Sequence, residues 1–197
     1  MANGHVYVLR HGQTEWSKSG KHTGRTDIPL TATGEQQAVA AGKVLARLRG
    51  AEKPALVLSS PRERATRTAE LAGLGSPDEV TEALSEWDYG DYEGLTTPQI
   101  RERVPDWTVW THPSPHGETA AAVTARADQV LARTRSALLG GDVVLIGHGH
   151  FSRVLVARWL ALPAEAGVGF AMDTAAVAAL GFERGAPQLL HLNLPPV

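Results

Sequence analysis

Two arginines, two histidines and one glutamate stand where short apolar runs of the sequence end: Arg10, His11, Arg62, Glu86 and His148. In α/β sheets the carboxyl ends of strands form the crevice that binds ligands. Gathered there, guanidinium groups would match the oxygens of a phosphoryl group, and a neutral imidazole would be a competent nucleophile near pH 7. A lone carboxylate repels phosphate, so its use would be to carry the proton of the leaving oxygen. These residue types predict phosphoryl chemistry.

The elements that must position these residues alternate between strands and helices. Runs of β-branched and other apolar residues predict strands over 6–10, 55–58, 80–81, 143–146, 175–182 and 188–192. Apolar residues at helical spacing predict helices over 33–50, 61–74, 119–139 and 151–160, with a short one from Thr97. This order favours an α/β fold, a three-layer α/β/α sandwich with a mostly parallel central sheet and room for one antiparallel edge strand.

The start of the helix over 61–74 has a strong local signal. Ser60 is of the type that caps free amides, and Pro61 fits the first helical position. Glu63 stands three residues after the serine and completes the pattern of a capping box. We therefore expect Ser60 to cap this helix.

Two segments lack the regularity of either element. Residues 13–29 are polar and contain glycine, so we expect a loop that lines the site. Residues 95–117 are interrupted by prolines and carry Trp107 and Trp110, which makes this segment a candidate cap in contact with substrate. The length is sufficient for one sizeable core. We expect a single domain over 1–197, with residues 95–117 as a small cap over the site.

Composition excludes several classes of function. A formal net charge of -2 offers no general attraction for nucleic acid or anionic lipid, so any anion binding must be local. The chain has no cysteine and therefore no disulfide, thiolate metal site or cysteine nucleophile. Its first residues lack the basic flank and apolar core of a secretory signal, and no apolar run approaches the roughly 20 residues of a membrane span. We expect a cytoplasmic protein with no membrane or nucleic-acid partner.

The stretch over 9–16, Leu-Arg-His-Gly-Gln-Thr-Glu-Trp, resembles the signature of the histidine phosphatase superfamily, the phosphoglycerate mutase-like group. Further landmarks of that family are found at 59–62 with 67–69, at 86–94, at 117–119 and at 147–149. Together they extend along the chain and are far more specific than the Arg-His-Gly triplet alone. Within the family, the chain is most similar to the branch of sedoheptulose-1,7-bisphosphatases, with acid phosphatases close behind.

The resemblance implies a role for each central residue. His11 is implied as the nucleophile that becomes phosphorylated, and Arg10, Arg62 and His148 as the phosphate pocket. Glu86 is implied as the acid of the first step and the base that activates water in the second. No metal and no other cofactor is implied. Further substrate contacts are carried over to Ser17, Thr23, Gly24, Tyr89, Gly149 and His150.

Other interpretations compete with some of these roles. Asp88, Asp91 and Glu93 are neighbours of Glu86 that could serve as the acid or simply be loop carboxylates. His11, His148 and His150 could suggest a metal site, but arginines nearby would oppose a divalent ion and no paired carboxylates accompany them. Two more arginines are interpreted as surface or structural charges rather than ligands: Arg64 and Arg67.

The sequence favours hydrolysis over transfer to a second hydroxyl. Mutases of this family carry a longer insertion between the acid and the Gly-Glu-Thr landmark, whereas residues 86–117 are a short stretch here. The alternatives are mutase-type phosphoryl transfer and a non-catalytic phosphate-binding module, which would not need all five central residues. The expected substrate is a small phosphate ester, such as a sugar phosphate, with a second phosphate held by Lys18, Lys21, Arg25 or Arg101. Monomer and homodimer both stay open.

Overall fold

The computed structural model describes residues 4–50 and 52–197. Residues 1–3, at the start of the segment expected to lack a secretory signal, lie outside the described residues. Its strands are β1 (Val6–Arg10), β2 (Leu56–Ser59), β3 (Glu79–Val80), β4 (Val143–Gly147), β5 (Val177–Glu183) and β6 (Ala186–Leu194). They form a six-stranded sheet in the order β3-β2-β4-β1-β5-β6. Pairings among β1 to β4 are parallel, and β5 is antiparallel to both of its neighbours. The predicted mostly parallel sheet is confirmed, but its antiparallel strand, β5, lies between β1 and β6 and is not an edge strand.

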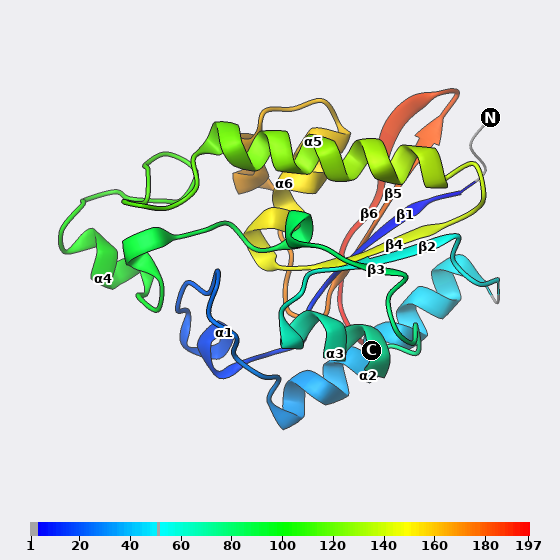
Figure 1. Cartoon of the computed structure of the whole chain (residues 1–197), viewed down its shortest axis with the longest axis horizontal. Helices are drawn as coiled ribbons and strands as arrows, with labels where there is room; N and C mark the ends of the chain where they lie inside the picture. Colours follow the sequence, from blue (N-terminus) through cyan, green and yellow to red (C-terminus); the bar gives the residue numbers. More distant parts are fainter. Residues whose placement is uncertain (1–3, 51) are drawn as a thin grey trace.

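Helices cover both faces of this sheet (Figure 1). The α-helices are α1 (Glu15–Ser19), α2 (Ala32–Arg49), α3 (Glu63–Leu71), α4 (Thr97–Arg101), α5 (Ala120–Ala137) and α6 (Gly149–Trp159). Short 3-10 helices, none of which the sequence suggested, are η1 (Glu82–Leu84), η2 (Gly90–Tyr92) and η3 (Ala164–Gly169). Helices α2 and α3 lie against one face and α5 and α6 against the other, which confirms the α/β/α sandwich.

The first four residues of the central strand β1 are apolar because both faces of the sheet are covered, and only its last residue, Arg10, is charged. Side chains of a strand point alternately to opposite faces, so both faces of β1 must be apolar if both are covered. Val6 and Val8 pack in the core under α5 and α6, whereas Tyr7 and Leu9 pack in the core under α2 and α3. The polar residues that follow β1 are therefore the first ones free to line a site.

A short helix occupies part of the segment predicted as a loop. Thr14 caps α1: its hydroxyl accepts a hydrogen bond from the Ser17 amide at 3.1 Å, and the Ser17 hydroxyl accepts one from the Thr14 amide at 2.9 Å. Gly20 ends the helix with a φ of 74°, in the left-handed region that suits glycine. The loop prediction is wrong over these residues because so short a helix shows no apolar periodicity.

The start of α3 also differs from the prediction. The helix begins at Glu63 with Arg62 as its N-cap, so the Ser60 hydroxyl lies before it and does not cap it. This hydroxyl accepts a long hydrogen bond from the Arg62 amide at 3.4 Å and lies 2.7 Å from Nε2 of His148. The Glu63 amide instead donates to the Asp27 carboxylate, at 3.0 and 3.1 Å to its two oxygens. A carboxylate that is distant in sequence thus satisfies the free amide, and Ser60 is available to the site.

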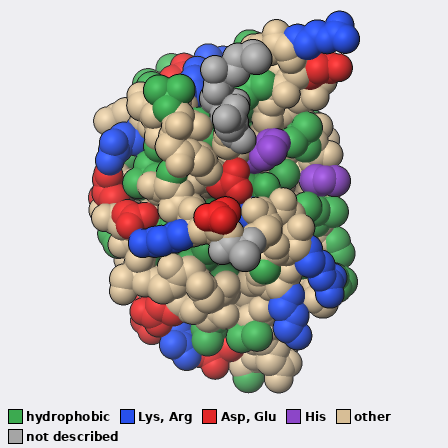
Figure 2. Space-filling model, turned by 90° about the vertical axis from the view of Figure 1, so that its right-hand side faces the viewer, with side chains coloured by type: hydrophobic (Ala, Val, Ile, Leu, Met, Phe, Trp, Pro, Cys, Tyr) green, Lys and Arg blue, Asp and Glu red, His purple; other side chains and the backbone are tan. Residues whose placement is uncertain are grey.

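The surface at the end of the molecule where β1 begins carries charged side chains of both signs. Figure 2 shows the end of the molecule where the chain enters β1, and basic and acidic side chains are interspersed over it. Across the part of the chain that the structure describes, no helix is long and apolar enough to cross a membrane.

Candidate active site

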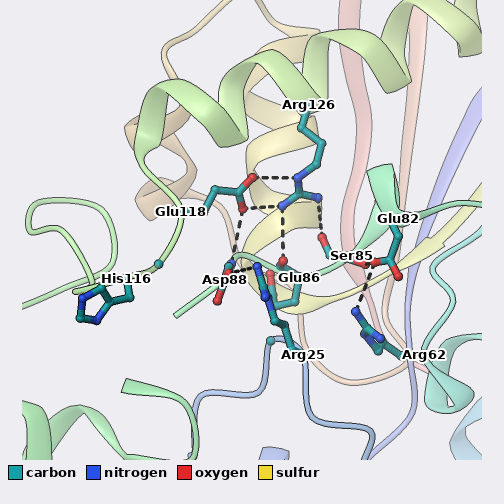
Figure 3. Close-up of a pocket in the computed structure, with 11 residues that line it drawn as sticks. Arg25, Arg62, Glu82, Ser85, Glu86, Asp88, His116, Glu118 and Arg126 are labelled. Atoms are coloured by element: carbon teal, nitrogen blue, oxygen red, sulfur yellow. Dashed lines mark hydrogen bonds and ion pairs between the residues drawn. The ribbon is translucent and has the colours of Figure 1, made fainter. Parts of the chain in front are cut away.

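The carboxyl ends of the parallel strands bring most of the predicted residues to one cavity of about 180 Å³. It is lined by Arg10, His11, Ser17, Thr23, Glu86, Tyr89, Gly149 and His150 from the predicted set, and by Gly20, Lys21, His22, Arg153 and Met172. His148 is fully buried beside it, with its ring centroid 5.1 Å from that of His11. Arg62 and Gly24 line a neighbouring cavity of about 350 Å³, and Glu86 lines both (Figure 3).

His11 is held as a neutral imidazole with one free nitrogen. Its Nδ1 lies 2.7 Å from the carbonyl oxygen of Gly12, and because a carbonyl only accepts, Nδ1 carries the proton. Burial, followed by the charges of Arg64 and Arg10, lowers the pKa of His11 well below its usual 6.5. Nε2 therefore keeps its lone pair at neutral pH, as a nucleophile requires.

His148 has the opposite tautomer. Arg64 donates from Nε to Nδ1 of His148 at 3.3 Å, so the proton of this imidazole is on Nε2, which donates to the Ser60 hydroxyl at 2.7 Å. Burial and then the charge of Arg64 lower the pKa of His148 well below 6.5. One imidazole thus offers a lone pair, and the other carries an N–H that donates to Ser60; a phosphoryl oxygen that took the place of the Ser60 hydroxyl would accept this N–H.

Arg64 is a buried structural cation beside the site, in keeping with its interpretation as a structural charge rather than a ligand. Its side chain is fully buried, and its terminal nitrogens donate to the carbonyls of Thr23, Gly24 and Thr26 at 3.2, 3.2 and 2.8 Å. Arg67, which was interpreted in the same way, is a half-exposed surface residue paired with carboxylates. The helical spacing of the sequence indicates that Arg64 is buried, because it places Arg64 on the same face of α3 as three small residues, Ala65, Thr68 and Ala69.

Glu86 is fixed at the N-terminus of α6. Its Oε1 accepts hydrogen bonds from the amides of Trp87 and Phe151, both at 2.8 Å, and its Oε2 accepts one from the His150 amide at 2.9 Å. These amides include free N–H groups of the first turn of α6, whose N-cap is His148. The carboxylate and the His148 imidazole are therefore positioned by the same helix end.

An arginine braces the backbone that carries this carboxylate. Arg126 donates from Nη1 to the Ser85 carbonyl at 2.6 Å and from Nη2 to the Glu86 carbonyl at 3.3 Å (Figure 3). It is itself paired with Glu118, 2.7 Å away. This contact gives the Gly-Glu-Thr landmark a structural role in the placement of the acid.

The carboxylates that compete with Glu86 have other partners. Asp88 pairs with Arg25 at 2.6 Å, and Asp91 pairs with the exposed His116 at 3.1 Å. Glu93 accepts hydrogen bonds from the amides of Gly24 and Thr26. Its carboxylate therefore fixes this loop and does not line the cavity of His11. Of the four acids, only Glu86 lines the cavity of His11.

One wall of that cavity is built from uncharged rings. The Tyr89 hydroxyl and Nδ1 of His150 are hydrogen-bonded at 2.6 Å, and His22 lies against Tyr89 with ring centroids 4.7 Å apart. Burial lowers the pKa of His22 to about 4 and that of His150 well below 6.5. Trp107 and Trp110 pack behind the two imidazoles, so the predicted substrate contact by these tryptophans is not seen in the described cavities.

Comparison with known proteins identifies the family of this chain. A sequence profile described as the histidine phosphatase superfamily (branch 1) matches residues 6–195. The chain belongs to this superfamily. It is 50% identical over 192 residues to an acid phosphatase of Mycobacterium tuberculosis, which covers 98% of this chain and 93% of the relative. It is 35% identical over 181 residues to sedoheptulose 1,7-bisphosphatase of Saccharomyces cerevisiae, covering 79% of this chain and 67% of the relative.

A solved structure extends the agreement to the whole fold. The structure of the product of the open reading frame Rv3214 from Mycobacterium tuberculosis has a TM-score of 0.95 and 50% identity, and the match covers 99% of this chain and 100% of that one. The predictions of an enzyme and of phosphatase rather than mutase chemistry are confirmed by these relatives. This histidine phosphatase retains the residues and the fold on which the family resemblance depends.

Arg10 is packed closely against the start of α6 in this histidine phosphatase. Arg10 donates from Nη1 to the Met172 carbonyl at 2.7 Å, and its buried Nε has no partner among the described residues. A Cβ on Gly149 would lie 3.2 Å from Cζ of Arg10, so the absence of a side chain at this position lets the guanidinium approach α6. The unpartnered N–H is a donor that a phosphoryl oxygen could fill.

Proposed function

We propose that the protein hydrolyses phosphomonoesters of small metabolites, with sugar phosphates as the substrate class, through a phosphohistidine on His11. The observation that carries the proposal is the hydrogen bond from Nδ1 of His11 to the Gly12 carbonyl, which leaves Nε2 unprotonated in the cavity. The printed names of two relatives, an acid phosphatase and a sedoheptulose 1,7-bisphosphatase, support both the reaction and the substrate class.

In the first step, the lone pair of Nε2 of His11 forms a bond to phosphorus while the bond from phosphorus to the ester oxygen breaks. The electron pair stays on that oxygen, which takes a proton from Glu86 and leaves as an alcohol. Oε2 of Glu86 has one amide donor where Oε1 has two, so we assign the transferred proton to Oε2. In the second step Glu86 removes a proton from water, the water oxygen attacks phosphorus, and the N–P bond breaks to restore His11.

The phosphoryl oxygens need cationic and N–H donors during both steps. Arg10 and His148 meet this need from the two central strands. We infer that Arg62 is the second guanidinium of the pocket, as the family resemblance implies, because its buried Nε has no hydrogen-bond partner among the described residues. The N–H groups of Arg64 are taken up by three loop carbonyls and by Nδ1 of His148, so Arg64 positions that imidazole instead. Arg62 pairs with Glu82 at 3.2 Å in the neighbouring cavity and would act from the far side of Glu86.

A phosphoenzyme trap tests the nucleophile. Wild type and His11→Ala are given radiolabelled phosphate ester, quenched in alkali, and assayed for acid-labile phosphate on the protein. We expect label on wild type alone and a loss of phosphate release by more than about 10³-fold in the variant. His116→Ala, which removes an exposed histidine, is the matched control. Equal phosphate release from wild type and His11→Ala would refute the proposal, and isomerised ester without free phosphate would indicate a mutase.

The leaving-group dependence tests the acid. Glu86→Gln keeps an oxygen for the amides but has no proton to give, so it should slow hydrolysis of alkyl phosphates far more than that of p-nitrophenyl phosphate. Asp88→Asn is the control, since Asp88 pairs with Arg25 outside the cavity of His11. Equal slowing of both ester types by Glu86→Gln would exclude the acid role.

We also propose the cellular and structural setting of this reaction. Residues 1–197 act as one domain in the cytoplasm on small molecules, without a nucleic-acid or membrane partner, and as a monomer or homodimer. Residues 95–117 serve as the cap, because Trp107 and Trp110 back the wall formed by His22 and His150. Localisation of a tagged chain and gel filtration of the purified protein test the setting.

A further inference from the structure

A turn over residues 172–176 leads into β5 and holds Arg10 in two ways. The Met172 carbonyl accepts a hydrogen bond from Nη1 of Arg10 at 2.7 Å, and the Ala176 carbonyl accepts one from the Arg10 amide at 3.2 Å. Met172 is buried and lines the cavity of His11. The buried Nε of Arg10 keeps an N–H without a partner among the described residues, so the turn fixes the guanidinium that offers this donor.

The backbone of this turn is strained. Ala175 has a φ of 56°, in the left-handed region that a residue with a Cβ seldom adopts, and its side chain is fully buried. Its amide donates to the carbonyl of His11 at 3.0 Å, so the strained residue is bonded directly to the end of β1. Strain of this kind persists only where the surrounding contacts hold the segment in place. The turn therefore needs an anchor outside the site.

The anchor is a reciprocal pair of hydrogen bonds between this turn and β6. Oδ1 of Asn193 accepts a hydrogen bond from the Asp173 amide at 2.7 Å, and Nδ2 of Asn193 donates to the Asp173 carboxylate at 2.8 Å. Both bonds are exposed to solvent, and contacts at the surface usually contribute little to the stability of the whole domain. Their effect is therefore local: they hold the turn.

The strand β6 is irregular at the point where this pair forms. Val177 is paired with Leu194 and Ala179 with His191, so β6 has one residue more than β5 between the two pairs. This extra residue makes a β-bulge, and Asn193 within it has a φ of 54°. A bulge changes the direction of a side chain, and asparagine adopts the left-handed region more readily than most residues. The bulge thus directs the Asn193 amide toward the turn.

We propose that Asp173 and Asn193 are positioning residues for the phosphatase reaction. Their pair holds the turn in place, and the Met172 carbonyl then fixes Arg10 with its free N–H available to the phosphoryl group. Neither Asp173 nor Asn193 lines the cavity of His11 or the cavity beside it, so both act through Arg10. This inference rests on the proposed phosphatase function, and it gives the edge strand β6 a part in that function.

Hydrolysis of p-nitrophenyl phosphate and inhibition by orthovanadate, an oxyanion similar to phosphate, test the positioning. Asn193→Gly removes both hydrogen bonds but keeps a residue that readily adopts a positive φ. Asn193→Asp sets two carboxylates against each other with little change of shape. Each variant should lower kcat/KM and weaken inhibition by orthovanadate by about 10-fold, because a misplacement of about 1 Å can cost up to about 10²-fold. The midpoint of urea unfolding should stay unchanged.

Two control variants separate charge and strand stability from positioning. Burial lowers the pKa of Arg10, and the negative charge of Asp173 is one of those that oppose this effect. Asp173→Asn removes that charge but keeps an oxygen that can accept from the Asn193 amide, so it should behave as wild type. Gln188→Ala breaks another exposed amide–carboxylate contact of β6, to Glu183 at 2.8 Å, and should also behave as wild type.

A double-mutant cycle with Arg10→Lys decides whether the pair acts through Arg10. Lysine lacks the guanidinium that the Met172 carbonyl orients, so Asn193→Gly should cause no further loss in the Arg10→Lys background. A further loss as large as that seen in wild type would overturn the positioning of Arg10.

Other results separate this inference from the proposed function. Wild-type kcat/KM and wild-type inhibition by orthovanadate in both Asn193 variants would overturn the positioning role while the phosphatase proposal stands. A loss in Asp173→Asn equal to that in Asn193→Gly would assign the effect to charge and would also overturn it. Failure of wild type to hydrolyse any ester would instead refute the proposed function, and the affinity for orthovanadate, measured by calorimetry, would still test the pair.

Discussion

Acid should destabilise this protein through imidazoles that are buried in the uncharged form, and His22 gives the sharpest measure of the effect. Burial lowers the pKa of His22 to about 4, from 6.5 in an exposed histidine. Between these two values the unfolded chain binds a proton at this position that the folded chain does not. The stabilising contribution is therefore complete above pH 6.5 and is lost as the pH falls toward 4.

The size of the effect follows from the shift. One pKa unit corresponds to about 1.36 kcal/mol, so at pH 5 the folded state has lost about 2 kcal/mol through His22 alone. The free energy of unfolding of a typical domain is about 5–15 kcal/mol, so this loss is a substantial fraction of it. Burial lowers the pKa of His11, His148 and His150 in the same direction, so the total loss in acid should be steeper still.

Urea unfolding of wild type and His22→Gln, at intervals from pH 7.5 to 5, isolates the contribution of one imidazole. The substitution removes the titrating group, so the free energy of unfolding of wild type should fall by about 2 kcal/mol more than that of the variant over this range. A constant offset at neutral pH, from altered packing, does not affect the comparison. His116→Gln is the matched loss of an exposed imidazole. Parallel pH curves for wild type and His22→Gln would refute the reasoning.

Two substitutions near the imidazoles give further predictions. Arg64→Met removes the donor that fixes the tautomer of His148, so kcat should fall by about 10²-fold or more and the imidazole nitrogen NMR signals of His148 should shift. Arg62→Met removes a guanidinium assigned to the phosphate pocket and should also lower kcat by about 10²-fold or more, and an unchanged kcat would contradict this assignment. Gly149→Ala places a methyl group against Arg10 and should lower kcat/KM for p-nitrophenyl phosphate by about 10-fold, with unchanged urea stability excluding a folding defect.

The sequence was sufficient for the sheet and for most of the site because the relevant signals are local. Residues 6–9 of β1 and all of β4 are apolar since both of their faces are covered, and the polar residues that come next must then lie at the sheet edge. His11 and His148 could be placed side by side on that basis. Conversely, the helix over Glu15–Ser19 was missed because it is marked by two capping hydroxyls and not by apolar residues at helical spacing.

What the sequence could not supply depends on contacts between distant residues. Ser60 has the type of an N-cap, yet its hydroxyl is bonded to His148, which is far along the chain, and Asp27 supplies the cap to α3 instead. The same applies to Arg64, because a buried cation is tolerated there only through carbonyls of the loop that precedes α2. Local propensity carries no information about either partner.

The strand order has a consequence for how the active centre is made as the chain leaves the ribosome. β1 holds Arg10 and precedes His11, and it is synthesised first, yet its hydrogen-bonded neighbours are β4 and β5, which are synthesised late. An emerging chain that has not reached Val143 therefore carries an apolar strand with neither edge bonded. Such late pairing of the first strand gives a fold of high contact order, in which long-range closure is slow. His11 is translated early but reaches its place in the cavity only when the last third of the chain has folded around it.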